Sequence, residues 1–318
     1  MALQYLIYKI KNLESKLFRK RIALVLFVFS SVAYGQQDSS ASLFKSSVLT
    51  SVNSFTNGVE GPAVDKDGNL YAVNFNHQGS IGKITPAGES SVFIDLPAGS
   101  IGNGIRFNRN GDMLIADYTM HNILRVDMVT KQITVFAHDS TMSQPNDIAI
   151  DKKDCLFASD PDWKNSKGRL WFVTKKGKFV LLENNMGTTN GVEVSPDNKH
   201  LYVNESAQRK VWVYDLSKKG KIRNKRLLIE FPDFGMDGMR CDVKGNLYIA
   251  RYGKGVVAIV SPAGELLREV ALIGKKPTNV AFGGTDGRTV YVTLQDQGNV
   301  ESFLCDTPGR EWQMQKKK

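Results

Sequence analysis

The 318-residue sequence predicts an all-β fold that is built from a repeated unit. A hairpin of two short alternating apolar strands, joined by a turn rich in Gly, Asp and Asn, occurs six times. Successive copies begin 41 to 47 residues apart, and no helical periodicity interrupts them. A β-rich repeat of this length is typical of four-stranded propeller blades, so we expect a six-bladed β-propeller with antiparallel blades.

The six hairpins can be recognised one after another along the chain. Their sequences are EGPAVDKDGNLYAVN, NGIRFNRNGDMLIAD, NDIAIDKKDCLFASD, NGVEVSPDNKHLYVNE, DGMRCDVKGNLYIAR and TNVAFGGTDGRTVYVTLQ. Alternation on both sides of a short polar turn predicts two paired strands in each copy. A β-sandwich also contains short strands, but it would not repeat one hairpin so regularly.

Each repeat also has room for the two outer strands of a blade. They are predicted in SIGKITPAGESSVFID, NILRVDMVTKQITVFA, GRLWFVTKKGKFVLLE, KVWVYDLSKKGKIRNKRLLIEF and GVVAIVSPAGELLREVAL, which follow the first five hairpins. The sixth repeat has a third strand in NVESFLCD and little chain beyond it. We therefore expect the N-terminal segment FKSSVLTSVNSF to supply the last strand and to close a single domain over residues 42–315.

The N-terminus predicts export. The segment LFRKRIALVLFVFSSVAYGQQ has a basic start, an apolar run and small residues before Gly35, as a secretory signal peptide does. The apolar run is shorter than the roughly 20 residues of a membrane span. We expect a signal peptide over residues 1–35, a short disordered linker over 36–41 and a periplasmic or secreted protein without stable membrane insertion. An uncleaved anchor is the alternative.

The charge balance does not indicate nucleic-acid binding. The formal net charge of the whole chain is +10, but the first 35 residues carry six Lys or Arg and one Glu, so the remainder carries +5. Its basic residues are scattered or lie in turns such as Lys218-Lys219, without interleaved aromatic residues. We expect a small molecule as the partner, and a monomer or weak dimer.

Polar residues stand at the head of every predicted first strand. The first strand of each propeller blade lines the central channel, so these heads converge at one mouth of it. The six heads all carry a side-chain oxygen: Glu60, Asn103, Asn146, Asn190, Asp237 and Thr278. Carboxylate and amide oxygens without His or Cys suit a hard cation such as Ca²⁺. Spacing alone leaves open a polar ring that is satisfied by water.

A second polar ring is expected at the same mouth, because the second strand of each hairpin runs back toward it. Its members are Asn74, Asp117, Asp160, Glu205, Arg251 and Gln295. The loop before Asn146 adds Gln144, and loops on a rigid scaffold commonly carry binding groups.

The hairpins resemble one known family. The segments NGVEVSPDNKHLYVNES, MDGMRCDVKGNLYIARY, PTNVAFGGTDGRTVYVT, EGPAVDKDGNLY and PNDIAIDKKDCLFASDP are similar to those of the gluconolactonase and senescence-marker-protein (regucalcin) propellers. The resemblance implies one divalent metal ion, usually Ca²⁺, with Zn²⁺, Mn²⁺ or Mg²⁺ as alternatives. The implied ligands are Glu60, Asn146, Asn190 and Asp237.

The resemblance also implies a reaction, namely metal-assisted hydrolysis of a lactone, with sugar lactones as the family's known substrates. Other lactones and organophosphates are the alternatives, as is a propeller that only binds a ligand. Asp237 is the candidate base for the attacking water, with Asp147 or Asp160 as alternatives. The candidate substrate-binding residues are Asn103, Gln144, Asp160 and Arg251. Some relatives place an arginine where this chain has Gln144, which leaves the identity of the substrate open.

Overall fold

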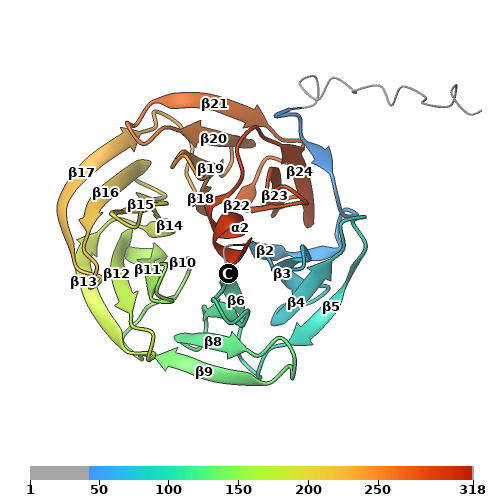
Figure 1. The fold of residues 1–318 in the computed structure, drawn as a ribbon, viewed down its shortest axis with the longest axis horizontal. Helices are drawn as coiled ribbons and strands as arrows, with labels where there is room; N and C mark the ends of the chain where they lie inside the picture. Colours follow the sequence, from blue (N-terminus) through green and yellow to red (C-terminus); the bar gives the residue numbers. More distant parts are fainter. Residues whose placement is uncertain (1–42, 317–318) are drawn as a thin grey trace, which may run out of the picture. The chain divides into compact units, whose positions relative to one another are not determined.

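The computed structural model describes residues 43–316, which form a ring of six blades around a central channel (Figure 1). The signal peptide and linker expected over residues 1–41 lie outside the described residues. In the part of the chain that is described, no helix is long and apolar enough to cross a membrane.

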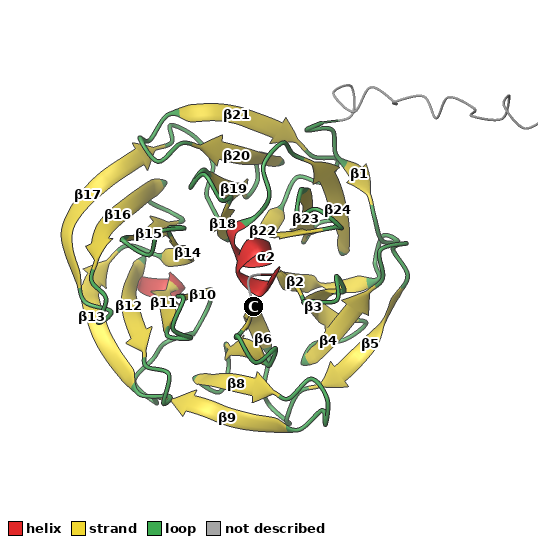
Figure 2. Ribbon diagram, viewed as in Figure 1, coloured by secondary structure: helices red, strands yellow, loops and turns green. Residues whose placement is uncertain are grey.

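Each blade is a four-stranded antiparallel sheet, as the repeats predict (Figure 2). The innermost strands of blades 1 to 6 are β2 (Phe55–Val64), β6 (Gly102–Phe107), β10 (Ile148–Ile150), β14 (Thr189–Val194), β18 (Met239–Cys241) and β22 (Pro277–Gly283). The second strands are β3 (Leu70–Phe75), β7 (Met113–Asp117), β11 (Leu156–Asp162), β15 (His200–Glu205), β19 (Leu247–Arg251) and β23 (Thr289–Leu294).

The outer strands complete the blades. The third strands are β4 (Ser80–Ile84), β8 (Asn122–Val126), β12 (Lys167–Val173), β16 (Lys210–Leu216), β20 (Val256–Val260) and β24 (Asn299–Leu304). The fourth strands are β5 (Ser90–Asp95), β9 (Ile133–His138), β13 (Phe179–Met186), β17 (Ile222–Glu230), β21 (Leu266–Ala271) and β1 (Ser47–Val48).

The ring closes with an N-terminal strand, which confirms the prediction. Strand β1 pairs antiparallel with β24, with Ser47 opposite Ser302 and Val48 opposite Glu301. The sixth blade therefore combines the two ends of the domain. This arrangement ties the last blade to the first stretch of folded chain, so the ring cannot open without losing these pairs.

An aspartate at the first position holds the inner hairpin turn of the first and fifth blades. In the turn DKDGN, the Asp65 carboxylate accepts hydrogen bonds from the backbone N–H groups of Asp67 and Asn69, both at 2.9 Å. Asp242 plays the same part in the fifth hairpin, accepting from Lys244 and Asn246. Asp and Asn favour such turns because their short side chains reach the backbone two to four residues ahead.

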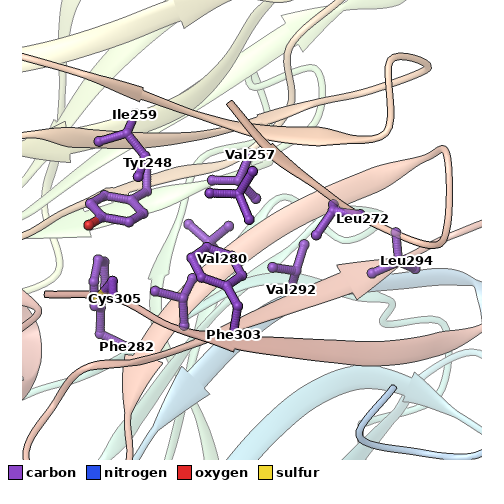
Figure 3. Close-up of a cluster of buried hydrophobic side chains, with 12 residues drawn as sticks. Tyr248, Val257, Ile259, Leu272, Val280, Phe282, Val292, Leu294, Phe303 and Cys305 are labelled. Atoms are coloured by element: carbon purple, nitrogen blue, oxygen red, sulfur yellow. The ribbon is translucent and has the colours of Figure 1, made fainter. Parts of the chain in front are cut away.

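The hydrophobic core lies between neighbouring blades. One cluster joins Tyr248 and Val257 of the fifth blade to Val280, Phe282 and Phe303 of the sixth (Figure 3). The rings of Tyr248 and Phe282 meet edge to face with centroids 4.9 Å apart. Because each blade buries apolar side chains on both of its faces, the inner strands are held rigidly around the channel.

Within residues 43–316, two short helices depart from the expectation that helical periodicity is absent. The 3-10 helix η2 (Trp163–Asn165) follows β11, and helix α2 (Arg310–Lys316) follows β24 and lies over the middle of the ring in Figure 2. Seven residues are too few to establish a helical period in the sequence. The expected domain end at residue 315 consequently falls inside α2.

Candidate functional site

The six strand heads lie together on one cavity at a mouth of the channel. Its volume is about 330 Å³. The residues that line it include Glu60, Asn103, Asn146, Asn190, Asp237 and Thr278, one from each blade. Glu60 lies on β2 and Asn190 on β14, whereas Asn146 and Asp237 stand just before β10 and β18. The structure thus brings all four proposed metal ligands to one place.

Two glycines allow the blades to meet this closely. Gly61, next to Glu60, has a φ of +58°, and a Cβ on it would lie 2.0 Å from the carbonyl oxygen of Asn103. A Cβ on Gly238, next to Asp237, would lie 1.9 Å from Cγ of Asn279. Any side chain at either position would push two blades apart at the floor of the cavity.

Three side chains of the ring have a buried oxygen without a hydrogen-bond partner. The atoms Oε2 of Glu60, Oδ1 of Asn146 and Oδ1 of Asn190 are buried and make no hydrogen bond. The other polar atoms of two of these residues are engaged. Oε1 of Glu60 accepts from Nδ2 of Asn279 at 2.7 Å, and Nδ2 of Asn190 donates to Oγ of Ser206 at 3.1 Å. Buried acceptors without a donor are costly, so this arrangement is suited to a ligand that accepts their lone pairs.

The two carboxylates of the ring, Glu60 and Asp237, repel each other when both are charged. Burial, followed by the negative charge of Asp147, raises the pKa of Glu60 to about 7. Burial also raises the pKa of Asp237 well above its ordinary value, with Glu60 as the next cause. A positive ion between the carboxylates would remove this penalty, because it favours both charged forms.

The donor set fits a hard divalent cation. It offers two carboxylates and two amide carbonyls and contains neither sulfur nor imidazole, which is the ligand chemistry of Ca²⁺. Among residues 43–316, no group of three or more His, Cys, Asp or Glu is placed to hold a metal. A cation at this ring would therefore depend on Asn146 and Asn190 as well as on the acids.

The remaining predicted residues are placed differently. Asn103 lines the cavity, as do Asn74 and Gln295 of the second ring, but Gln144, Asp160 and Arg251 do not. Gln144 instead has a buried Oε1 without a hydrogen-bond partner. The alternative base Asp147 is fully buried behind the ring, 3.4 Å from Arg106 and 3.3 Å from Arg240.

The Asp160 carboxylate is hydrogen-bonded to the loop that leads to Asn146. Its carboxylate accepts from the backbone N–H groups of Ser143 and Gln144, both at 2.7 Å, and from Nε1 of Trp171 at 3.0 Å. It also pairs with Arg169 at 2.8 Å. With every oxygen in use, Asp160 has no free acceptor for a substrate and acts as a loop anchor.

Arg251 anchors a second loop, the one that leads to Asp237. Its guanidinium pairs with Asp233 at 2.8 Å, donates from Nε to the carbonyl oxygen of Gly235 at 3.3 Å, and stacks 3.7 Å from the centroid of Phe231. It is fully buried. The second-strand ends on these two blades therefore hold the loops of the site and do not face the cavity.

Sequence reasoning did not single out three further residues of the site. Tyr118 and Trp163 line the cavity, and Trp163 has 44% of its surface exposed. Both residues follow the second strand of a blade, so only their position in a loop at the mouth of the channel could have indicated that they belong to the site. Asn279 supports Glu60 from behind, and its only signal was a second polar residue directly after Thr278.

Comparison with known proteins decides the family. The model of the SMP-30/gluconolactonase/LRE-like region matches residues 34–296, which is most of the chain. The chain belongs to this family. The resemblance of the hairpins to gluconolactonases and regucalcins is thereby confirmed.

Individual members of the family share about a quarter of their residues with this chain. Gluconolactonase from Zymomonas mobilis is 27% identical over 270 residues, covering 74% of this chain and 75% of its own. Diisopropyl-fluorophosphatase from Loligo vulgaris is 26% identical, covering 85% and 94%. The crystal structure of regucalcin from Agrobacterium tumefaciens superposes with a TM-score of 0.73 at 22% identity, covering 82% and 94%, which shows the shared fold. The lactonases among its relatives support a lactone hydrolase.

Proposed function

We propose that this protein is an exported, metal-dependent hydrolase that opens the ring of a lactone, with sugar lactones as its substrates. The observation that carries the proposal is the ring of Glu60, Asn146, Asn190 and Asp237, which line one cavity and contain three buried oxygens without a hydrogen-bond partner. Membership of a family that contains gluconolactonases supports the choice of substrate.

The four ring residues would hold the metal ion, with Ca²⁺ favoured by their oxygen ligands. When bound, the ion would supply a positive charge that stabilises the negative charge developing on the lactone carbonyl oxygen. The chain supports this arrangement by keeping each ligand in place, since Asn279 holds Glu60 and Ser206 holds Asn190.

Asp237 would act as the base. Its carboxylate lines the cavity and accepts a proton from the water that attacks the carbonyl carbon. The bond between the carbonyl carbon and the ring oxygen then breaks, and the ring oxygen takes up a proton to become a hydroxyl. The product is the open hydroxy acid, so one water molecule is consumed for each ring opened.

The rest of the cavity favours a substrate that carries several hydroxyls. Asn103 offers an amide donor and acceptor beside the ring, and Gln295 offers an amide donor, since its oxygen accepts from Tyr252. Tyr118 and Trp163 offer aromatic surface, whereas Asn74 is engaged by Gly58 and Gly79. Sugars combine hydroxyls with apolar C–H faces, and an exposed indole such as that of Trp163 packs against such a face.

A second candidate is hydrolysis of a phosphotriester at the same ring. It is favoured by one observation, the match to diisopropyl-fluorophosphatase over 94% of that protein. A phosphoryl oxygen would take the place of the carbonyl oxygen, and the same base would serve. The two candidates differ in their substrates and share the metal.

Hydrolysis of a substrate panel tests the proposal. The panel contains glucono-, galactono- and simple γ- and δ-lactones together with a fluorophosphate, assayed after treatment with a chelator and again after adding Ca²⁺, Zn²⁺, Mn²⁺ or Mg²⁺. We expect the chelator to abolish turnover of the sugar lactones and Ca²⁺ to restore it. No turnover of any lactone by folded protein with any metal would refute the proposal, and turnover of the fluorophosphate alone would favour the second candidate.

Export is the remaining element of the proposal. It is supported by the basic start, the apolar run and the small residues of the first 35 positions. N-terminal sequencing of protein from the periplasmic or culture fraction tests it. We expect the mature chain to begin just after Gly35, and protein that retains residues 1–35 in the cell would contradict it.

A further inference from the structure

Helix α2 lies over the middle of the ring (Figure 1). The ring residues stand at the beginning of the inner strands, whereas α2 contacts the other ends of these strands. Nη2 of Arg310 donates to the carbonyl oxygen of Ile150 at 2.8 Å, and Nε2 of Gln315 donates to that of Val64 at 2.9 Å. Helix α2 is therefore tied to the ends of the first and third inner strands that lie away from the ring residues.

A cluster of charged side chains lies where α2 meets the inner strands. It contains three arginines and three carboxylates, namely Arg106, Arg240, Arg310, Asp147, Glu193 and Glu311. Arg106 is fully buried, and Arg240 and Arg310 are each only 2% exposed. The formal charges balance only when Glu311 of α2 is counted. Buried charges require such compensation, because water cannot supply it.

Glu311 faces two arginines of the cluster. Its Oε1 is 2.6 Å from Nε of Arg106, whereas its Oε2 is 4.0 Å from Nε of Arg240, a charge–charge contact that is too long for a hydrogen bond. Arg240 in turn donates from Nη1 to Oδ1 of Asn279 at 3.0 Å. These contacts lead from the C-terminal helix to the residue behind Glu60.

The orientation of Asn279 is fixed by its neighbours. Its Oδ1 accepts from Arg240 and from the backbone N–H of Val280 at 2.9 Å, so its Nδ2 is directed at Glu60. The side chain also packs against Gly238, where a Cβ would collide with it. Asn279 therefore donates to Oε1 of Glu60 and leaves Oε2 free toward the cavity.

We propose that Glu311 of the C-terminal helix is a positioning residue for the ring carboxylate Glu60, acting through Arg240 and Asn279. The inference rests on the proposed function in one respect, which is that the ring binds a divalent cation. It assigns to α2 a role in metal affinity that goes beyond covering the middle of the ring.

The physical basis of this role is that the negative charge of Glu311 balances the positive charge of one arginine in the cluster. Without it, the cluster holds three arginines and two carboxylates, and the unpaired positive charge lies among residues that contact Asn279. Glu60 lies on the other side of Asn279 from Arg240, and its free oxygen would attract Arg240 away from Asn279. A guanidinium that pairs with Glu60 competes directly with a metal ion for the same carboxylate.

Metal affinity measured by isothermal titration of chelator-treated protein with Ca²⁺ tests the inference. The variants are Glu311→Gln, which removes the charge, and Glu311→Asp, which keeps it. Gln315→Ala is the matched control, because it removes a contact of the same helix with Val64 that does not involve the charged cluster. We expect Glu311→Gln to raise the Kd for Ca²⁺ by about 10- to 100-fold, as the loss of outer-shell partners does. Glu311→Asp and Gln315→Ala should stay within about threefold of the wild type, which is less than the outer-shell effect.

The outcomes separate this inference from the proposed function. If the wild type binds Ca²⁺ and folded Glu311→Gln binds it equally well, α2 has only a structural role and the inference is wrong. If the folded wild type binds no divalent metal, the proposed metal site fails and the inference fails with it. If Glu311→Gln does not fold, Asn279→Ala tests the hydrogen bond from Asn279 to Glu60 instead. We expect the same rise in the Kd for Ca²⁺, and an unchanged Kd would contradict the inference.

Discussion

Asn279 donates a 2.7 Å hydrogen bond to Oε1 of Glu60 and leaves Oε2 of that carboxylate buried without a partner. Glu60 is thus held by one oxygen and presents the other to a cavity that it shares with Asp237. Such a half-satisfied buried acid is unfavourable in the absence of a cation and favourable in its presence.

Replacing Glu60 with Gln separates metal binding from folding. We expect Glu60→Gln to raise the Kd for Ca²⁺ more than about 100-fold, because a direct ligand contributes at least as much as an outer-shell partner. The unfolding temperature of the metal-free variant should be higher than that of the metal-free wild type, since the repulsion with Asp237 is gone. Calorimetry and titration measure both quantities. Glu89→Gln, in the exposed turn between β4 and β5, is the control and should change neither.

Asp237→Asn tests the base. The amide keeps an oxygen that can bind a cation but cannot take a proton from water, so kcat should fall by about 10²- to 10⁴-fold while Ca²⁺ remains bound. The measurement is kcat at saturating lactone together with the Kd for Ca²⁺. Unchanged hydrolysis would exclude Asp237 as the base.

Trp163 provides a test of the substrate class. If its exposed indole packs against the sugar, Trp163→Ala should raise KM for sugar lactones by about three- to tenfold and leave kcat nearly unchanged, since an aromatic contact is worth about 1 kcal/mol. Trp163→Phe should recover most of the loss, and simple aliphatic lactones should be affected less. An equal change in KM for every lactone would show that Trp163 does not distinguish sugar lactones from other lactones.

Asp160 should behave as an anchor of the loop before Asn146. Asp160→Asn removes the pair with Arg169 and an acceptor for buried donors, so the free energy of unfolding should fall by about 1–3 kcal/mol. The ranking of lactones by kcat/KM should stay as in the wild type, because the carboxylate does not line the cavity. A selective loss of polyhydroxylated substrates, with stability unchanged, would instead place Asp160 against the substrate.

The sequence predicts most of the fold because each blade repeats the same local signals. Alternating strands and Asp-rich turns mark all six hairpins, and the short sixth repeat predicts closure by the N-terminal strand. The ring of strand heads follows from the same repeat, because residues at equivalent positions of a propeller must converge on its channel.

The sequence does not predict which polar residues behind the ring face the cavity. Asp160 and Arg251 hold the same repeat position as Asn74, yet they turn toward the loops before Asn146 and Asp237. This choice depends on which backbone groups the neighbouring loop leaves unpaired, a tertiary property without a local pattern. The sequence does not predict the position of helix α2 for a different reason. The contacts of α2 with Arg106 and Arg240 join residues far apart in the chain.

The most direct test of the metal ring is a crystal structure of the protein soaked with Mn²⁺, which reports the ion through its anomalous scattering. We predict one strong peak in the cavity, coordinated by Oε2 of Glu60, Oδ1 of Asn146, Oδ1 of Asn190 and the carboxylate of Asp237. An ordered cavity filled only with water at saturating metal, or an ion bound elsewhere in the channel, would contradict the account.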